Sequence, residues 1–150
     1  MLSKHLPHPF FSYGLVVLQF SLIGVLLASS DWHFSKITIS IYAIAIFIGL
    51  WAIKSMHFGH FNIIPDPMPN IKLVTTGPYQ FIRHPMYFSI LLFFLAVVIM
   101  DVSLVSMGLY LNLFLVLFVK LSYEEYLLTQ SLPDYPQYQS KTKRLIPFIL

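Results

Sequence analysis

From Met86 to Val119 the sequence reads MYFSILLFFLAVVIM-DVS-LVSMGLYLNLFLVLFV, and this stretch decides the fold. It is apolar almost throughout and too long for one ordinary membrane span, since about 20 residues suffice to cross the ~30 Å hydrocarbon layer. Asp101 and Ser103 interrupt it, and Asp and Ser favour turns. The stretch therefore predicts a hairpin of two membrane helices. The first (86–100) is short, and the second (104–122) continues past the membrane to about Ser131.

Two more apolar runs precede this hairpin, at about residues 10–28 and 37–56. The 150-residue chain is 57% hydrophobic and only 10% charged, with a mean hydropathy of +0.76, which lies outside the soluble range. No run alternates with the period of two that a barrel requires. We therefore expect one all-α integral membrane domain over residues 1–150, with about four transmembrane helices. The alternative for the first run is a cleaved signal peptide, but the run is longer than the usual apolar region of ~7–15 residues.

The basic residues support four spans. With this topology, eight of the nine Lys and Arg residues fall on one side and only Lys36 falls on the other. The eight are Lys4, Lys54, Lys72, Arg83, Lys120, Lys141, Lys143 and Arg144. The positive-inside rule then places both termini and the 57–85 connection in the cytoplasm of a multi-pass inner-membrane protein.

Two cytoplasmic segments remain. The 57–85 connection contains five prolines, which predicts an ordered, non-helical cover over the membrane domain. Pro133 and Pro136 are expected to end the last long helix, and the tail from Tyr138 to Phe148 mixes basic, aromatic and apolar residues as interfacial segments do.

The first polar cluster is Arg83-His84-Pro85, at the start of the hairpin. Pro85 suits the first turn of a helix, so free backbone N–H groups would lie beside Arg83 and His84, with Tyr87 on the same face. This arrangement suits a carboxylate or a phosphate. The alternative is an Arg that extends to lipid headgroups.

The second polar cluster is Glu124-Glu125, at the far end of the hairpin. A carboxylate there suits a cation, such as an amine or sulfonium, or the hydroxyls of a ribose. Neighbouring helix residues point about 100° apart, so at most one of the two acids is expected to face a pocket. The alternative is a pairing of Glu124 with Lys120, one turn earlier.

Other chemistries are disfavoured. His57 and His60 are three residues apart and His84 lies on the same side, but no metalloprotease-type His-Glu pattern accompanies them, so hydrogen-bonded or interfacial His is favoured over a metal site. There is no cysteine, no Gly-rich phosphate loop and no nucleic-acid signature, so no metal and no nucleic-acid partner are predicted.

Together the motifs resemble the isoprenylcysteine carboxyl methyltransferase family, which is related to phospholipid N-methyltransferases. The resemblance extends over about residues 62–148. It rests on Asn62–Pro65, Leu73–Tyr79, Arg83–Tyr87, Glu124–Glu125 with Leu128, Tyr135–Tyr138 and Arg144–Pro147.

The resemblance implies an integral membrane enzyme that uses S-adenosylmethionine and acts on a lipophilic or lipid acceptor from the bilayer. The cofactor would lie between residues 62–87 and 120–147. The implied cofactor-binding residues are Lys72, Leu73, Val74, Tyr79, His84, Pro85, Met86, Tyr87 and Glu124.

Three residues are assigned to the reaction itself. Arg83 would hold the cofactor carboxylate, so Arg83→Ala is expected to weaken cofactor binding and leave the thermal midpoint nearly unchanged. Lys120, which stands where relatives carry a substrate-binding Arg, would orient an anionic acceptor. Glu125, or a tyrosine, would serve as base for an amine acceptor.

Four alternatives remain open. The first is the acceptor chemistry of a phospholipid N-methyltransferase. The second is an NADPH-dependent enzyme like the sterol reductases, although the cover offers only Lys72 and Arg83 for a second phosphate. The third is a non-catalytic membrane subunit. The fourth is a substrate tunnel that a second copy completes, because only two helices precede the hairpin.

Overall fold

The computed structural model describes residues 9–30, 32–56, 64–65, 67 and 72–147. Within them lie four long helices: α1 (Pro9–Ser29), α2 (Lys36–Ser55), α3 (Pro85–Met100) and α4 (Leu104–Ser131). Two short elements accompany these, the 3₁₀ turn η1 (Gly77–Gln80) and α5 (Tyr135–Lys141). The described residues form no strand, which confirms the all-α prediction.

The predicted helices coincide with the long helices to within a residue or two, including the continuation of α4 past its predicted span to Ser131. Among the described residues, α1, α2 and α4 are long and apolar enough to cross a membrane. The chain is thus an integral membrane protein. The 16-residue α3 is shorter, about 24 Å at 1.5 Å per residue, whereas the 28-residue α4 measures about 42 Å. Because the hydrocarbon layer is only ~30 Å thick, one end of α4 stands clear of it.

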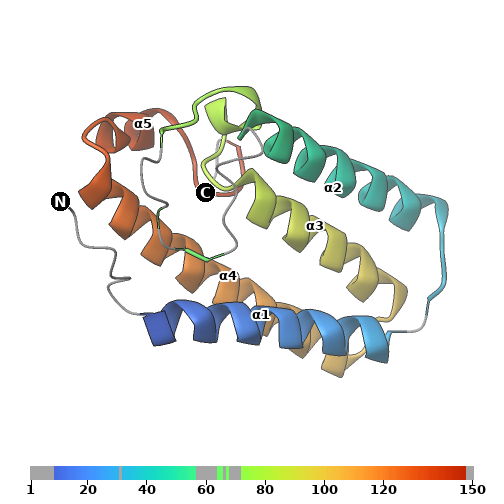
Figure 1. Ribbon diagram of the computed structural model, residues 1–150. Coiled ribbons are helices and arrows are strands. Elements are labelled where there is room, and N and C mark those ends of the chain that lie inside the picture. The colour runs from blue at the N-terminus through green and yellow to red at the C-terminus, as the bar shows by residue number, and fades with distance from the viewer. Residues whose placement is uncertain (1–8, 31, 57–63, 66, 68–71, 148–150) are drawn as a thin grey trace.

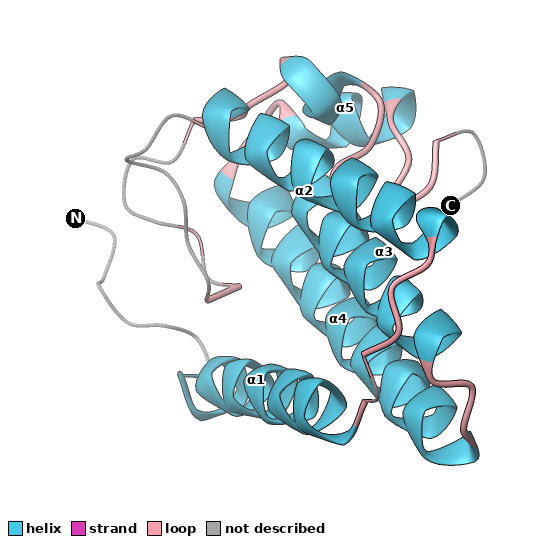
Figure 2. Cartoon of the chain, turned by 90° about the vertical axis from the view of Figure 1, so that its right-hand side faces the viewer, coloured by secondary structure: helices cyan, strands magenta, loops and turns pink. Residues whose placement is uncertain are grey.

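The helices pack in the order α2, α3, α4, α1 (Figures 1 and 2). Small residues on α2, namely Ala45, Gly49 and Ala52, allow α3 to approach closely, and Ser89 of α3 donates a hydrogen bond to the Ala45 carbonyl at 2.8 Å. The apolar core lies mainly between α3 and α4, with Leu26 of α1 and Leu145 of the tail packed into it.

Sequence-local signals fix the hairpin between α3 and α4. Ser103 and Ser106 form a capping box at the start of α4, in which each side chain bonds the other residue's backbone N–H. Asp101 caps the end of α3. The predicted turn therefore lies where Asp101 and Ser103 interrupt the apolar stretch.

The C-terminal segment is tied to the residues just before α3. The backbone N–H groups of Arg83 and His84 donate to the carbonyls of Lys143 and Arg144 at 2.8 and 3.0 Å. The Tyr138 hydroxyl of α5 donates to the Tyr79 carbonyl of η1 at 2.6 Å. In consequence α5, η1 and the start of α3 form one unit at a single end of the helix bundle.

One expectation about the segments outside the spans was wrong in detail. The cover was expected to be non-helical, but Gly77–Gln80 forms a 3₁₀ turn with Pro78 near its start. Pro133 and Pro136 follow the end of α4 at Ser131, as expected, and Pro136 in addition lies in the first turn of α5. Pro78 and Pro136 both lie at the start of a short helix for the same physical reason. Proline lacks a backbone N–H, and at the first positions of a helix that N–H would have no intrahelical acceptor.

Candidate active site

Two adjoining cavities lie at the end of the bundle where α5 and η1 meet α3 and α4. Counting the open solvent at their mouths, the larger contains about 520 Å³ of empty space and the smaller about 370 Å³. They share Met56, Tyr79, Arg83, His84 and Glu124 as lining residues.

The remaining lining residues divide between the two cavities. The larger continues between the cover and the end of α4, along Lys72, Leu73, Val74, Leu128, Leu132, Tyr135 and Tyr138. The smaller ends on Met86 and Tyr87 in the first turn of α3. One end of the combined space is thus largely apolar, and the other is polar.

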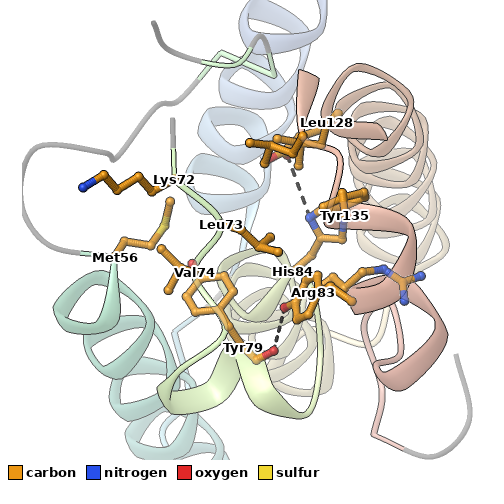
Figure 3. Close-up of a pocket in the computed structure, with 12 residues that line it drawn as sticks. Met56, Lys72, Leu73, Val74, Tyr79, Arg83, His84, Leu128 and Tyr135 are labelled. Carbon is orange, nitrogen blue, oxygen red and sulfur yellow. Dashed lines mark hydrogen bonds and ion pairs between the residues drawn. The ribbon is translucent and has the colours of Figure 1, made fainter. Parts of the chain in front are cut away.

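Nearly all residues predicted to bind the cofactor are brought together here. Lys72, Leu73, Val74, Tyr79, His84, Met86, Tyr87 and Glu124 line one or both cavities. Pro85 is fully buried as the first residue of α3 and fixes where that helix begins. Lys72 is exposed, and Figure 3 shows its amine at the outer edge of the cavity, directed away from His84.

Glu124 presents the accessible negative charge of the site. Its side chain is 30% exposed and accepts a 2.8 Å hydrogen bond from the Tyr87 hydroxyl. His84 stacks on the Tyr87 ring, and its Nδ1 lies 3.8 Å from the Glu124 carboxylate. This carboxylate is therefore held in place yet free to receive a cation.

Glu125, its neighbour, points elsewhere and is only 3% exposed. Its carboxylate contacts Arg83 Nε at 2.6 Å, Arg144 Nε at 3.1 Å and His84 Nε2 at 3.2 Å. A buried carboxylate needs such partners, because leaving it unpaired costs several kcal/mol. Neither cavity is lined by Glu125, so the described structure offers it no route to act as a base.

Arg83 is held by the same cluster. Its Nη1 donates to the carbonyls of Gln139 and Thr142, in addition to the Nε contact with Glu125. Figure 3 shows the guanidinium directed toward the C-terminal segment. These contacts tie the start of α3 to α4 and to the tail, so they argue against the expectation that Arg83→Ala spares the thermal midpoint.

Lys120 also lies away from the cavities. It is 1% exposed, and its Nζ donates to Gln19 Oε1 of α1 at 2.7 Å. The same Nζ lies over the face of the Tyr87 ring, 5.4 Å from the ring centroid. The sequence suggested Glu124 as the partner. Gln19 takes that place because α1 packs against α4 and a buried ammonium in a membrane helix needs a polar partner at its own depth.

Sequence reasoning assigned no site role to Met56, Leu132, Tyr135 or Tyr138, all of which line the larger cavity. Tyr135 and Tyr138 belong to the motif that carried the resemblance, so their spacing just after the last long helix was an available signal. Burial raises the pKa of Tyr138 to about 12 and also raises those of Tyr79 and Tyr135. These hydroxyls therefore keep their protons at neutral pH.

Two of the predicted features lie outside the described residues. They are the pair His57 and His60, considered as metal ligands, and the Asn62–Ile63 part of the first motif.

A family model described as phospholipid methyltransferase matches residues 34–134, which is 101 of the 150 residues. The comparison with curated proteins gave no match. The chain belongs to the phospholipid methyltransferase family. The resemblance found in the sequence is thereby supported at the level of this related family, and isoprenylcysteine specificity is a separate question.

Proposed function

We propose that this member of the phospholipid methyltransferase family transfers a methyl group from S-adenosylmethionine to a lipid acceptor that enters from the bilayer. The observation that carries the proposal is Glu124, a partly exposed carboxylate at the meeting point of the two cavities. A cationic ligand with a large apolar part suits such a site, because the charge finds a fixed partner and the remainder is buried against apolar walls.

The residues present fit the cofactor. Glu124 would hold its ammonium or sulfonium charge, and Leu73, Val74, Leu128 and Leu132 would enclose its planar base. Since Arg83 is occupied by Glu125, we assign the cofactor carboxylate to the first backbone N–H groups of α3, at Met86 and Tyr87. Those groups have no intrahelical acceptor and lie at the positive end of the helix dipole.

The bound cofactor would supply an electrophilic methyl group on a sulfonium sulfur. What the chain contributes is position and exclusion of water, which lower the barrier to an in-line displacement. Tyr79 and Tyr87 line the space near Glu124, where their hydroxyls would orient ligands by hydrogen bonding.

We favour an amine as the acceptor. A carboxylate acceptor needs a cation, but Arg83 and Lys120 are both engaged, by Glu125 and Gln19 respectively. An ammonium must lose a proton before it can attack, and His84 is the base that the geometry supports. Its Nε2 faces Glu125, which fixes Nε2 as the protonated nitrogen and leaves the lone pair on Nδ1, on the Glu124 side. Glu125 would then stabilise the imidazolium that forms.

Ligand binding tests the cofactor assignment. Isothermal titration of the detergent-purified chain with S-adenosylmethionine and with NADPH should give micromolar binding of the first only. Glu124→Gln should weaken that binding at least tenfold, while Asp101→Asn, an acid at the opposite end of α3, should leave it unchanged. Binding of NADPH would favour a reductase, and binding of neither would favour a non-catalytic subunit.

A second assay tests the acceptor. Liposomes that contain phosphatidylethanolamine and a prenylated cysteine are offered together with isotope-labelled methyl donor. Label on the phospholipid amine supports the proposal. Label only on the prenylcysteine carboxyl would assign the chain to carboxyl methylation instead.

A further inference from the structure

Tyr135, the first residue of α5, is the one tyrosine of the larger cavity that combines full burial with an unused hydroxyl. The residue is 2% exposed and lines the cavity (Figure 3), and its hydroxyl has no hydrogen-bond partner among the residues that the structure describes. A buried polar group without a partner is unfavourable, and native proteins rarely keep one without a reason.

Tyr138, three residues further along α5, provides the contrast. It is buried and lines the same cavity, but its hydroxyl donates to the Tyr79 carbonyl and so contributes to the fold. The difference shows that this short helix can satisfy a tyrosine hydroxyl internally. At Tyr135 it does not.

The Tyr135 hydroxyl is a donor under all physiological conditions. Burial, followed by the nearby charges of Glu125 and Glu124, raises its pKa above the ordinary value for tyrosine. Its O–H can therefore be satisfied by a ligand that offers an acceptor, such as a hydroxyl oxygen, an ether oxygen or a ring nitrogen.

The position of Tyr135 within the larger cavity indicates which part of a ligand would lie beside its hydroxyl. Tyr135 shares the larger cavity with Leu73, Val74, Leu128 and Leu132, and none of these five lines the smaller cavity. The first turn of α3 lines only the smaller one. The four apolar side chains that accompany Tyr135 suit a planar heterocycle and its sugar better than they suit a charged amino-acid group.

We propose that the Tyr135 hydroxyl donates a hydrogen bond to the nucleoside half of the bound methyl donor, to a ribose oxygen or an adenine nitrogen. The inference rests on the proposed function, because it takes S-adenosylmethionine to be the occupant of the cavity. Tyr135 would then be a cofactor-binding residue. Its hydroxyl has no hydrogen-bond partner among the described residues of the free protein and would gain one from the bound cofactor.

The test is Tyr135→Phe in the full chain, purified in detergent and titrated calorimetrically with S-adenosylhomocysteine and with 5′-methylthioadenosine. The second probe keeps the nucleoside and lacks the amino-acid carboxylate and amine. Loss of one hydrogen bond should weaken both ligands by roughly 2- to 12-fold. The thermal midpoint of the ligand-free variant should be unchanged or higher, because no internal bond is lost.

Two matched variants serve as controls. Tyr138→Phe should lower the ligand-free thermal midpoint, since it removes the bond to Tyr79. Tyr126→Phe, on the exposed face of α4, should change neither midpoint nor affinity.

Three results would overturn the inference while the proposed function survives. They are wild-type affinity of Tyr135→Phe for both probes, a lowered ligand-free midpoint like that of Tyr138→Phe, or weaker binding of S-adenosylhomocysteine alone. If the wild-type chain binds neither probe nor S-adenosylmethionine itself, the proposed function fails, and this inference fails with it.

Discussion

At the scale of single residues, the most informative contrast is between Glu124 and Glu125. The two share a helix and a sequence context, but one is partly exposed at the cavities and the other is enclosed by Arg83, His84 and Arg144. The first is suited to bind a ligand and the second to hold three segments together. Adjacent identical residues thus carry different roles because a helix turns them about 100° apart.

Arg83→Ala should therefore destabilise the protein. Removing the guanidinium takes away the closest partner of Glu125 and frees the carbonyls of Gln139 and Thr142, so we expect a loss of about 3–5 kcal/mol in the free energy of unfolding. Denaturant unfolding in detergent measures it. Lys72→Ala, at the exposed edge of the site, is the control and should have almost no effect on stability. If Arg83→Ala leaves the free energy of unfolding unchanged, the structural role of Arg83 is contradicted and the ligand-binding role predicted from the sequence is supported.

His84→Gln separates catalysis from binding. The amide can still donate to Glu125 but cannot take up a proton, so methyl transfer to an amine should fall about 10²-fold or more. Binding of S-adenosylmethionine should change far less. Single-turnover methylation and calorimetric binding on the same preparation measure the two quantities. Loss of binding in proportion to activity would mean that His84 acts by packing on Tyr87 rather than as a base.

At the scale of elements, η1 must lie close to α2 for the cover to line the larger cavity. Gly77 permits this, since its φ of 62° lies in the left-handed region that favours glycine. A Cβ at this position would collide with the Ser55 hydroxyl and approach Trp51 Nε1 to 3.1 Å. The backbone of the cover therefore touches α2 where any side chain would separate them.

Gly77→Ala should weaken S-adenosylmethionine binding by about tenfold or more, because the left-handed backbone alone costs roughly 1–2 kcal/mol and the contact with Ser55 adds to it. The helices should persist, as judged by far-ultraviolet circular dichroism. Gly24→Ala on α1, where a Cβ meets nothing within 4 Å, is the matched control and should bind as wild type. Equal affinities for the two variants would show that the cover does not form part of the binding site.

The elements are also where the sequence was most informative. Hydropathy and the Asp101–Ser103 interruption predicted the four long helices to within a residue or two, because such signals are local to each segment. The partners of the buried charges were not predictable in the same way. Lys120 meets Gln19 across 101 positions and Arg83 meets Glu125 across 42, so these choices depend on how α1 and the tail pack. The unused hydroxyl of Tyr135 likewise becomes visible only once its surroundings are known.

At the scale of the whole molecule, the unequal helix lengths explain where the site lies. The hairpin aligns α3 and α4 at Asp101–Ser103, so the additional length of α4 projects at the opposite end. Glu124, Glu125 and Leu128 belong to that projecting part, and α5 follows directly. The cavities therefore lie where a polar cofactor from solvent and an acyl chain from the bilayer can both reach.

The orientation in the membrane is testable, because the hairpin turn and α5 lie at opposite ends of the helix bundle. Lys54, Lys141 and Lys143 lie at the α5 end and Lys36 lies at the other, so from the positive-inside rule we expect the α5 end to face the cytoplasm. The chain has no cysteine, which allows single thiols to be introduced at Val102 in the turn and at Ser140 in α5, both of them exposed. In intact cells a membrane-impermeant maleimide should label Val102→Cys at once, and should label Ser140→Cys only after the membrane is permeabilised. The reverse pattern would show that the protein has the opposite orientation in the membrane. Labelling of both variants in intact cells would mean that the α3–α4 hairpin does not span the bilayer.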